Sequence, residues 1–234
     1  MELLARLAKD PSRAAILLDV DGVLAPIVPR PADARVPDDI RTELHRLAGR
    51  YALVACVSGR AGTDAETIVG VPGLTYVGNH GLELEPDVDE WTERLEALLA
   101  GLDWPRVENK RLTASLHYRD MDEIAARREL DAIAERARSA GFVARYGRKV
   151  LELVPPLEAN KGTAVRHLLG ERGLRRALYA GDDTTDLDAF AALDPLELGV
   201  RVAVASPEGP AALRAAAQIV LSSQADVLPL FRQL

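Results

Sequence analysis

Ala14-Ala-Ile-Leu-Leu-Asp-Val-Asp-Gly22 is an apolar run that ends in two aspartates, Asp19 and Asp21. Such a run is typical of a buried strand, and in open parallel α/β sheets functional sites form beyond the carboxyl ends of the strands. Because side chains two apart on a strand point the same way, we expect both carboxylates at that edge. Like charges in one place need a cation or a proton to relieve them. Asp-Gly after a strand is also a common turn signal, so the motif alone leaves a simple turn open.

Further apolar runs alternate with segments of helical periodicity toward both ends of the chain. Buried apolar strands separated by helices imply a parallel sheet that is covered on both faces. The predicted fold class is therefore α/β, with a parallel-sheet, Rossmann-like core. The predicted strands are 14–19, 52–57, 74–77, 177–180, 200–204 and 219–221, and the predicted helices are 38–47, 61–69, 161–169, 185–193 and 210–217, with a last helix closing the chain.

The middle of the chain has a different pattern, with longer strands that mix polar and apolar residues. These predicted strands are 107–119 and 142–154, and they follow predicted helices at 88–100 and 121–140. Half-polar strands suit an open sheet with one solvated face. We therefore predict an inserted α/β cap domain at 84–154, packed as a lid over a core formed by 1–83 and 155–234.

The composition is that of an ordinary soluble globular protein: 48% of the 234 residues are hydrophobic, 28% are charged, and the net charge is −7. The negative charge argues against a nucleic-acid partner, because phosphate backbones attract basic surfaces. The charged N-terminal stretch does not resemble a signal peptide, and no apolar run reaches the roughly 20 residues that span a bilayer. A cytoplasmic protein without membrane contact is expected. Cys56, the one cysteine, lies in the apolar run 52–57 and is expected to be buried.

Ala180-Gly-Asp-Asp-Thr-Thr-Asp-Leu-Asp188 follows another predicted strand and opens a helix. The preference of acidic residues for a helix N-terminus would explain one or two of its aspartates. It does not explain Asp182, Asp183 and Asp186 together at the end of a second core strand. Clustered carboxylates at strand ends form an oxygen-rich site suited to Mg²⁺, which is the expected cofactor.

Two shorter motifs complete the set. Ser58-Gly59-Arg60 follows the strand 52–57, and a serine hydroxyl together with backbone N–H groups entering a helix can hold a phosphate. Lys161 opens the helix 161–169, where a lysine can neutralise a phosphate and orient a nucleophile. Taken alone, Ser-Gly is a turn and Lys161 is a solvated surface lysine. All four motifs lie at a strand or helix boundary, so the topology would bring them to one edge of the sheet.

In this order the four motifs resemble the haloacid-dehalogenase superfamily of phosphohydrolases, and the insert between Ser58 and Lys161 resembles that superfamily's C2-type cap. Further motifs are similar to the trehalose-6-phosphate phosphatase family. They are Gly78-Asn-His-Gly-Leu-Glu83, Glu108-Asn-Lys110, Ser115-Leu-His-Tyr-Arg119, Gly147-Arg-Lys-Val-Leu-Glu152 and Gly181-Asp-Asp-Thr-Thr-Asp186. Two positions depart from that family: Leu187 stands where glutamate is usual, and Leu153-Val-Pro-Pro156 lacks the basic residue that often precedes the proline.

The resemblance implies a Mg²⁺-dependent phosphatase that hydrolyses trehalose 6-phosphate to trehalose and phosphate, the last step of trehalose biosynthesis. Asp19 would be the nucleophile, since a carboxylate is already anionic at neutral pH, and would form an aspartyl-phosphate. Asp21 would act as general acid and then as general base. By resemblance, the Mg²⁺ ligands are Asp19, the backbone carbonyl of Asp21, and Asp182; the phosphate is held by Ser58 and Lys161; and the supporting residues are Gly59, Arg60, Asp183 and Asp186.

The resemblance also assigns recognition of the sugar, mainly to the cap. The residues carried over are Asn79, His80, Asn109, Lys110, His117, Arg119, Arg148 and Glu152. Each also has a simpler explanation, as a solvated strand residue or as a structural histidine. Trp91 and Trp104 are expected to pack inside the cap rather than to bind sugar. The hinges for opening and closing the cap are expected near 81–85 and 154–158.

Alternatives stay open at this stage. The substrate could be another sugar or glycoside phosphate, such as sucrose phosphate or mannosyl- or glucosyl-3-phosphoglycerate, and a phosphomutase is a further variant. A non-catalytic sugar-phosphate-binding regulatory module is a second class, although the intact site residues argue against it. A dinucleotide enzyme is a third, but Asp-Val-Asp-Gly22 stands where that class needs a glycine-rich pyrophosphate loop. The resemblance also allows a functional pairing with a trehalose-6-phosphate synthase.

Overall fold

The computed structural model describes residues 2–28, 30, 33–147, 149–206 and 209–234. The chain forms two compact units, one of Met1–Gly81 with Ala159–Leu234 and one of Leu82–Glu158. We call the first the core unit and the second the inserted unit. Every helix among the described residues is too short or too polar to span a membrane.

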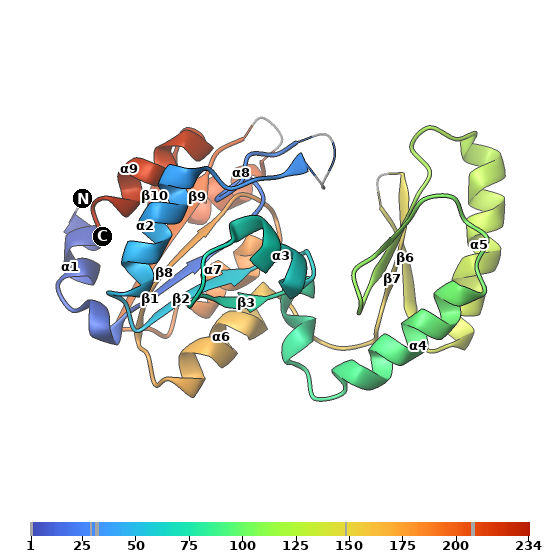
Figure 1. Ribbon diagram of the computed structural model, residues 1–234, viewed down its shortest axis with the longest axis horizontal. Helices are drawn as coiled ribbons and strands as arrows, with labels where there is room; N and C mark the ends of the chain where they lie inside the picture. The colour runs from blue at the N-terminus through green and yellow to red at the C-terminus, as the bar shows by residue number, and fades with distance from the viewer. Residues whose placement is uncertain (1, 29, 31–32, 148, 207–208) are drawn as a thin grey trace. The chain divides into compact units, whose positions relative to one another are not determined.

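The core unit is built on a six-stranded sheet with the strand order β10-β9-β8-β1-β2-β3 (Figure 1). Its strands are β1 (Ala15–Leu18), β2 (Leu53–Val57), β3 (Thr75–Val77), β8 (Arg176–Gly181), β9 (Leu198–Val204) and β10 (Ile219–Leu221). All neighbouring pairs are parallel. Every residue of β1 and β2 is buried, including Cys56, because helices cover both faces of the sheet.

Alternate residues of the central strands pack against different helices. The helices of this unit are α1 (Glu2–Ala8), α2 (Asp38–Ala48), α3 (Gly62–Val69), α6 (Lys161–Glu171), α7 (Asp186–Ala192), α8 (Ala211–Ala216) and α9 (Val227–Phe231), with 3-10 segments at Pro11–Arg13 and Gln224–Asp226. A further 3-10 segment, Asn79–Leu84, begins in this unit and ends in the inserted unit. Ile16 and Leu18 share one core cluster with α1, α2 and α9. Tyr179, on β8, instead contacts Phe190 of α7 edge to face, with ring centroids 6.1 Å apart.

Two helices show how far periodicity predicts this unit. Ile40, Leu44 and Leu47 of α2 form the predicted apolar stripe, and all three are buried. The helix lies beside α9 in Figure 1, and Arg46 donates a hydrogen bond to the carbonyl of Phe231 across that contact at 2.7 Å. The N-terminal helix α1 was not predicted, because its seven residues are too short to show a clear period.

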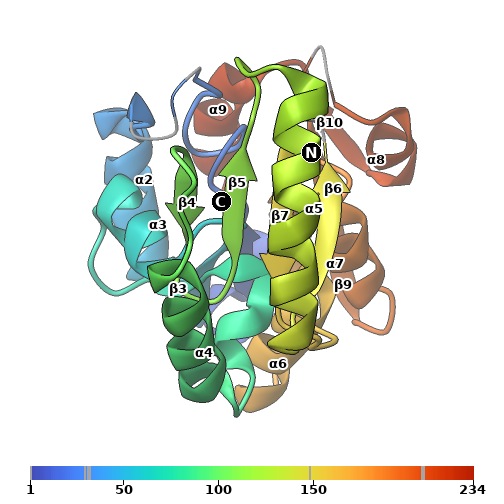
Figure 2. The ribbon, with the colours of Figure 1, turned by 90° about the vertical axis from the view of Figure 1, so that its right-hand side faces the viewer.

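The inserted unit has four strands, β4 (Val107–Asn109), β5 (Ala114–His117), β6 (Val143–Gly147) and β7 (Val150–Val154). They form an antiparallel sheet with the order β4-β5-β7-β6. Its helices, α4 (Val88–Ala100) and α5 (Glu123–Ser139), pack on the same face of the sheet, which is the face turned to the viewer in Figure 2. Leu116, Leu151 and Leu153 are buried beneath them. The opposite face mixes polar side chains, among them Arg145 and Glu152, with three valines, so its strands are half-polar as predicted.

Each long strand predicted in the insert is wrong as a single element and is a hairpin instead. The segment 107–119 contains β4 (Val107–Asn109) and β5 (Ala114–His117), and the segment 142–154 contains β6 (Val143–Gly147) and β7 (Val150–Val154). Arg111 and Lys149 take positive φ values of 69° and 62° between the strands. Positive φ lets the chain reverse, but in arginine or lysine it has no local signal in the sequence.

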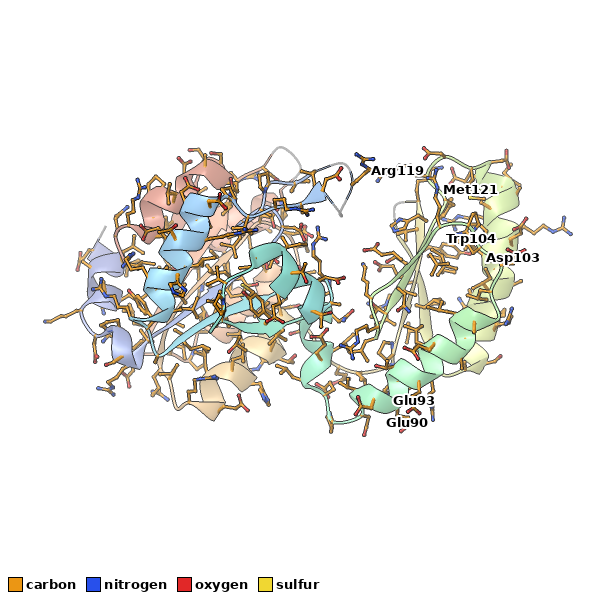
Figure 3. All side chains as sticks on the ribbon, in the orientation of Figure 1. Glu90, Glu93, Asp103, Trp104, Arg119 and Met121 are labelled. Carbon is orange, nitrogen blue, oxygen red and sulfur yellow. The ribbon has the colours of Figure 1, made fainter. Side chains whose placement is uncertain are left out.

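Both tryptophans pack inside the inserted unit, as predicted. Trp104 is 7% exposed, and its Nε1 donates a hydrogen bond to the carbonyl of His117 at 3.1 Å (Figure 3). Trp91 contacts the ring of Phe142 edge to face, with centroids 5.2 Å apart. These contacts hold α4 and the segment before β4 against the sheet.

Candidate active site

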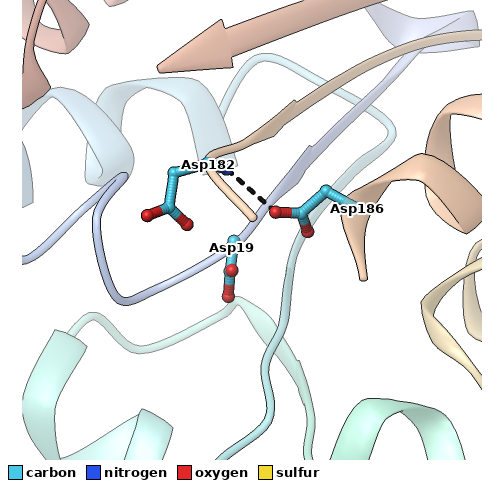
Figure 4. A group of neighbouring side chains, drawn as sticks. All are labelled: Asp19, Asp182 and Asp186. Carbon is cyan, nitrogen blue, oxygen red and sulfur yellow. Dashed lines mark hydrogen bonds between the residues drawn. The ribbon is translucent and has the colours of Figure 1, made fainter. Parts of the chain in front are cut away.

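Three buried carboxylates meet at the carboxyl edge of the core sheet. Asp19 follows β1 and Asp182 follows β8; because these strands are parallel neighbours, with Leu18 paired to Ala180, their ends deliver both side chains to one place. Asp186 opens α7 just beyond. Oxygens of the three carboxylates lie within 4.8 Å of one another (Figure 4). The exposed fractions are 6% for Asp19, 7% for Asp182 and 0% for Asp186.

Asp186 serves as a hydrogen-bond hub. Its Oδ1 accepts from Tyr179 Oη at 2.8 Å and from Lys161 Nζ at 2.7 Å. Its Oδ2 accepts from the backbone N–H groups of Asp182 at 2.8 Å and Asp183 at 2.9 Å. Burial and the Asp186 charge raise the pKa of Tyr179 well above its ordinary value, so the phenol keeps the proton that it donates. With four donors, the Asp186 carboxylate is fully occupied.

Lys161 is buried, and the simple expectation of a solvated surface lysine is wrong. It is 1% exposed at the start of α6, and its Nζ lies 2.5 Å from Asp19 Oδ2 and 2.7 Å from Asp186 Oδ1. A capping box between Asn160 and Thr163 fixes this end of the helix. Burial lowers the pKa of Lys161, but the two carboxylates raise it by more, so the ammonium stays charged.

The buried charges do not balance when all three acids are ionised. Three carboxylates and one ammonium leave a formal charge of two negatives in the cluster. Burial and the neighbouring carboxylates raise the pKa of Asp182 to about 8, and burial raises that of Asp19 to about 7 against the lowering effect of Lys161. Among the described residues, none donates a hydrogen bond to the Asp182 carboxylate. Hard oxygen ligands with this charge fit a divalent cation such as Mg²⁺.

Gly22 makes room for the Asp182 carboxylate. A Cβ at Gly22 would lie 2.0 Å from Asp182 Oδ2, closer than any real contact, and Gly22 has a φ of 77° that side chains rarely adopt. Its N–H donates to the carbonyl of Ala25 at 2.8 Å and closes the turn after Asp21. Gly22, which the sequence marks only as part of a turn, is therefore also part of the acidic site.

The loops after β2 and β3 are joined beside this cluster. Ser58 is buried, and its Oγ accepts from the N–H of Arg60 at 3.2 Å. The N–H of Asn79 donates to the carbonyl of Arg60 at 2.7 Å, and the N–H of His80 donates to that of Ser58 at 2.8 Å. Asn79 and His80 both have positive φ. The His80 ring covers Gly59, where a Cβ would lie 2.6 Å from the imidazole.

Sequence reasoning missed the direct contact between Arg60 and Asp21. Arg60 Nε lies 2.6 Å from Asp21 Oδ2, and its Nη2 lies 2.7 Å from Oδ1. The two residues are 39 positions apart, so no local pattern signals the pair. Tyr179 was missed as well, because within the apolar run of β8 a tyrosine has the appearance of an ordinary core residue.

The predicted sugar-binding residues of the inserted unit lie on or beside its sheet. Glu152 is on β7, opposite Ser115 in the strand register. His117 Nε2 lies 3.0 Å from Glu108 Oε2, and Lys110 Nζ lies 4.0 Å from the same oxygen. Glu108 was not among the predicted site residues, although the motif Glu108-Asn-Lys110 contained its signal.

The other predicted residues of this unit are less enclosed. Asn109 is exposed, and its Oδ1 accepts from the N–H of Arg111 at 2.8 Å. Arg119 is exposed just beyond β5 (Figure 3). Arg148 lies outside the described residues. The structure therefore groups His117 and Lys110 around Glu108, whereas Asn109 bonds within its own turn to the N–H of Arg111.

Comparisons with known proteins cover both units. A family model described as "Trehalose-phosphatase" matches residues 17–106 and 95–221. "Trehalose-phosphate phosphatase" from Mycobacterium ulcerans is 33% identical over 215 residues, a match that covers 81% of this chain and 54% of the relative. A protein of Mycobacterium tuberculosis named as an uncharacterized glycosyl hydrolase is 34% identical over 81% of this chain and 16% of its own length. The chain thus spans about half or less of these relatives.

A solved structure supports the fold independently. The C-terminal domain of Trehalose-6-phosphate phosphatase from C. albicans matches with a TM-score of 0.67 at 22% identity, covering 98% of this chain and 94% of that one. The likeness extends over the parallel core and the insert, so the predicted α/β fold class with an inserted α/β unit is confirmed. Because the family model spans both units and includes Asp19 and Asp182, the chain belongs to the trehalose-phosphatase family.

Proposed function

We propose that this chain hydrolyses trehalose 6-phosphate to trehalose and phosphate through an aspartyl-phosphate on Asp19, with Mg²⁺ as cofactor. The observation that carries the proposal is the buried Asp19 carboxylate, held 2.5 Å from Lys161 Nζ beside the open carboxylate of Asp182. If Lys161, Asp19 and Asp186 formed only a structural salt bridge, the carboxylate of Asp182 would not be needed beside them. Family membership supports trehalose 6-phosphate as the substrate.

Mg²⁺ would be held by Asp19, Asp182 and the backbone carbonyl of Asp21, and when bound it supplies positive charge that screens nucleophile from phosphate and stabilises the transition state. Asp186 is not proposed as a ligand, since four donors already occupy its oxygens. Its task is to hold Lys161 and the turn of Asp182 and Asp183 in place. This division agrees with the supporting role expected for Asp183 and Asp186.

In the first step Asp19 attacks the phosphorus. Lys161 binds Oδ2 at 2.5 Å and the N–H of Val20 binds Oδ1 at 2.7 Å, so the carboxylate is already oriented before substrate arrives. The bond from Asp19 to phosphorus forms as the bond from phosphorus to the sugar oxygen breaks. For this step Asp21 would leave its bidentate contact with Arg60 and carry a proton, which passes to that leaving oxygen.

In the second step a water molecule attacks the phosphorus of the aspartyl-phosphate. Asp21, now a carboxylate, accepts the proton of the water, and the Asp19 carboxylate is regenerated as inorganic phosphate forms. Ser58 Oγ, from the loop after β2, and Lys161 Nζ, from the first turn of α6, are proposed to bind the phosphate oxygens. The backbone of Arg60 supports Ser58 through the hydrogen bonds that join the loops, and Gly59 leaves room for the His80 ring beside it.

We also propose that the inserted unit sets the sugar specificity, as a cap built on residues 84–154. The face of its sheet opposite the helices offers charged side chains that suit a disaccharide rich in hydroxyl groups. The proposed sugar ligands are Asn79, His80, Asn109, Lys110, His117, Arg119, Arg148 and Glu152. A functional pairing with a reaction that makes trehalose 6-phosphate is part of the proposal, and the cytoplasmic location stays a prediction.

Phosphate release from trehalose 6-phosphate, with and without Mg²⁺, beside glucose 6-phosphate and sucrose 6-phosphate, tests the proposal. We expect Mg²⁺-dependent release that is fastest with trehalose 6-phosphate. Asp19→Asn should abolish release, whereas Asp103→Asn, the same change at an exposed position of the inserted unit, should leave it unchanged. Release by the Asp19 variant would remove that residue from the role of nucleophile. Faster release from another sugar phosphate would reject the substrate and keep the chemistry.

A further inference from the structure

The buried ammonium of Lys161 is shared between two buried carboxylates. Its Nζ lies 2.5 Å from Asp19 Oδ2 and 2.7 Å from Asp186 Oδ1. An ammonium has three N–H donors, so these two contacts leave the third donor for an oxygen of the substrate phosphate. The direction of that third donor depends on where the two carboxylate oxygens lie. Whatever fixes the Asp186 oxygen therefore also helps to aim Lys161.

Tyr179 fixes the Asp186 side of this contact. It lies on β8 and is 0% exposed, and its Oη donates to Asp186 Oδ1 at 2.8 Å, which is the same oxygen that binds Lys161. The tyrosine ring packs edge to face on Phe190, with centroids 6.1 Å apart, so the phenol is itself held in place. One carboxylate oxygen thus connects a central strand of the sheet to the ammonium at the start of α6.

We propose that Tyr179 is a positioning residue that acts on Lys161 through Asp186 and so directs the ammonium at the substrate phosphate. The inference rests on the proposed phosphatase function. An oxygen that accepts from two donors divides its negative charge between them. Without the phenol, Asp186 Oδ1 would attract Lys161 more strongly and would also be freer to move. The ammonium would then shift toward Asp186, away from Asp19 and from the place of the phosphate.

The main competing role for Tyr179 is to hold the turn that carries Asp182, a proposed Mg²⁺ ligand. That turn is bound by Asp186 Oδ2, which accepts from the N–H groups of Asp182 and Asp183 at 2.8 and 2.9 Å. Tyr179 bonds to the other oxygen, Oδ1, together with Lys161, and this favours the role through Lys161. A residue that acts on Lys161 affects phosphate binding and kcat, whereas a residue that acts on the turn affects Mg²⁺ binding.

The test uses Tyr179→Phe, which removes the hydroxyl group and keeps the ring. Calorimetry gives the Kd of Mg²⁺ and, at saturating Mg²⁺, the Kd of inorganic phosphate. The kcat is measured with trehalose 6-phosphate, or with whichever phosphate ester the wild type hydrolyses. We expect phosphate to bind about 3- to 10-fold more weakly and kcat to fall by a similar factor, the size of effect expected when one buried hydrogen bond of a site is lost. The Kd of Mg²⁺ should hardly change.

Tyr76→Phe is the matched control. Tyr76 lies on β3 of the same sheet, and its Oη donates to the carbonyl of Val71 at 2.8 Å, so this variant loses a tyrosine hydrogen bond of the same length. It should lower the midpoint of thermal unfolding and leave both Kd values and kcat at their wild-type values. A partly unfolded preparation lowers the number of binding sites rather than the Kd, so reduced stability alone does not imitate the expected result.

A Tyr179→Phe protein that binds phosphate as tightly as the wild type, with reduced stability as its only change, would show a purely structural hydrogen bond and would overturn the inference. Weaker Mg²⁺ binding would overturn it too, because the effect would then lie on the turn of Asp182. If the wild type binds phosphate but hydrolyses no phosphate ester, the proposed function fails, while the Kd of inorganic phosphate still decides the role of Tyr179. A wild type that binds no inorganic phosphate would overturn the inference together with the proposed phosphate site.

Discussion

Asp182 and Asp186 are four positions apart and have the same side chain, yet their surroundings give them different tasks. Asp186 accepts four hydrogen bonds, including one from the ammonium of Lys161. Asp182 receives none on its carboxylate from the described residues, and burial raises its pKa to about 8. A carboxylate that is desolvated and left without donors favours a proton or a cation. Both residues are aspartates, so the residue type does not decide which of them binds the metal. The hydrogen-bond donors around each carboxylate decide it.

Gly22→Ala should weaken Mg²⁺ binding, because its new Cβ would occupy the place of the Asp182 carboxylate, 2.0 Å from Oδ2. The positive φ of Gly22 adds about 1 kcal/mol of backbone strain. We expect a higher Mg²⁺ concentration for half-maximal activity and a lower midpoint of thermal unfolding. Titration of phosphate release with Mg²⁺ measures the first effect.

Gly73→Ala is the matched control for this change. Gly73 has a φ of 86° in the same unit, but nothing lies within 4 Å of a Cβ placed there. It should therefore show the strain of about 1 kcal/mol without any change in the Mg²⁺ requirement. An unchanged Mg²⁺ requirement in Gly22→Ala would mean that Asp182 can move aside, or that it does not bind the cation.

At the level of elements, the close approach of α6 and α7 fixes Lys161 over the acidic cluster. Gly162, the residue after Lys161, allows that approach: a Cβ there would lie 2.4 Å from the carbonyl oxygen of Asp188. Backbone atoms cannot yield as a flexible side chain can. Gly162→Ala should force the helices apart, destabilise the fold by about 1–3 kcal/mol and lower kcat, as measured by denaturant unfolding and phosphate release.

Gly170→Ala, in the same helix, should have the opposite effect on stability. A Cβ at Gly170 meets nothing within 4 Å, so alanine should stabilise α6 by about 1 kcal/mol through its higher helix propensity. The kcat should not change. If both variants shifted stability in the same direction, helix propensity rather than the contact with Asp188 would control this element.

The predicted elements were most accurate where burial on both faces leaves a continuous apolar run. The strands next to Asp19, Cys56 and Ala180 were predicted to within one residue at each end, since such runs end where the chain becomes polar. The two hairpins of the inserted unit were missed because Arg111 and Lys149, rather than glycine, carry the positive φ. Local sequence cannot show a conformation that tertiary contacts impose.

The candidate site was predictable for a related reason, and only in part. Asp19 and Asp182 follow neighbouring parallel strands, so topology alone predicts that they meet. The pairing of Arg60 with Asp21 depends on how two loops pack, and the burial of Lys161 depends on the place where α6 begins. Neither the Arg60–Asp21 contact nor the burial of Lys161 produces a periodic pattern in the sequence. The residues missed or misjudged are thus those whose roles come from long-range contacts.

For the molecule as a whole, the acidic cluster links folding to pH and to Mg²⁺. The folded-state pKa values of about 7 for Asp19 and about 8 for Asp182 lie far above the ordinary 3.8. Between about pH 4 and about pH 8 the two carboxyl groups hold more protons in the folded protein than in the unfolded chain. The free energy of unfolding therefore falls as the pH rises through this range. The contribution of these two groups is therefore largest below about pH 4 and is lost as pH rises toward about 8.

Mg²⁺ should reverse this loss, because it binds the deprotonated carboxylates of the folded state and is absent from the unfolded chain. We expect saturating Mg²⁺ to raise the unfolding midpoint more at about pH 9 than at about pH 6, where protons compete for the same oxygens. Thermal unfolding with and without Mg²⁺ at both pH values measures this shift. The titration of exposed groups affects the samples with and without Mg²⁺ equally, so it does not contribute to the shift. Asp182→Asn should reduce both the Mg²⁺ effect and its pH dependence. A Mg²⁺ effect that is equal at the two pH values, or that persists in this variant, would place the cation away from Asp182.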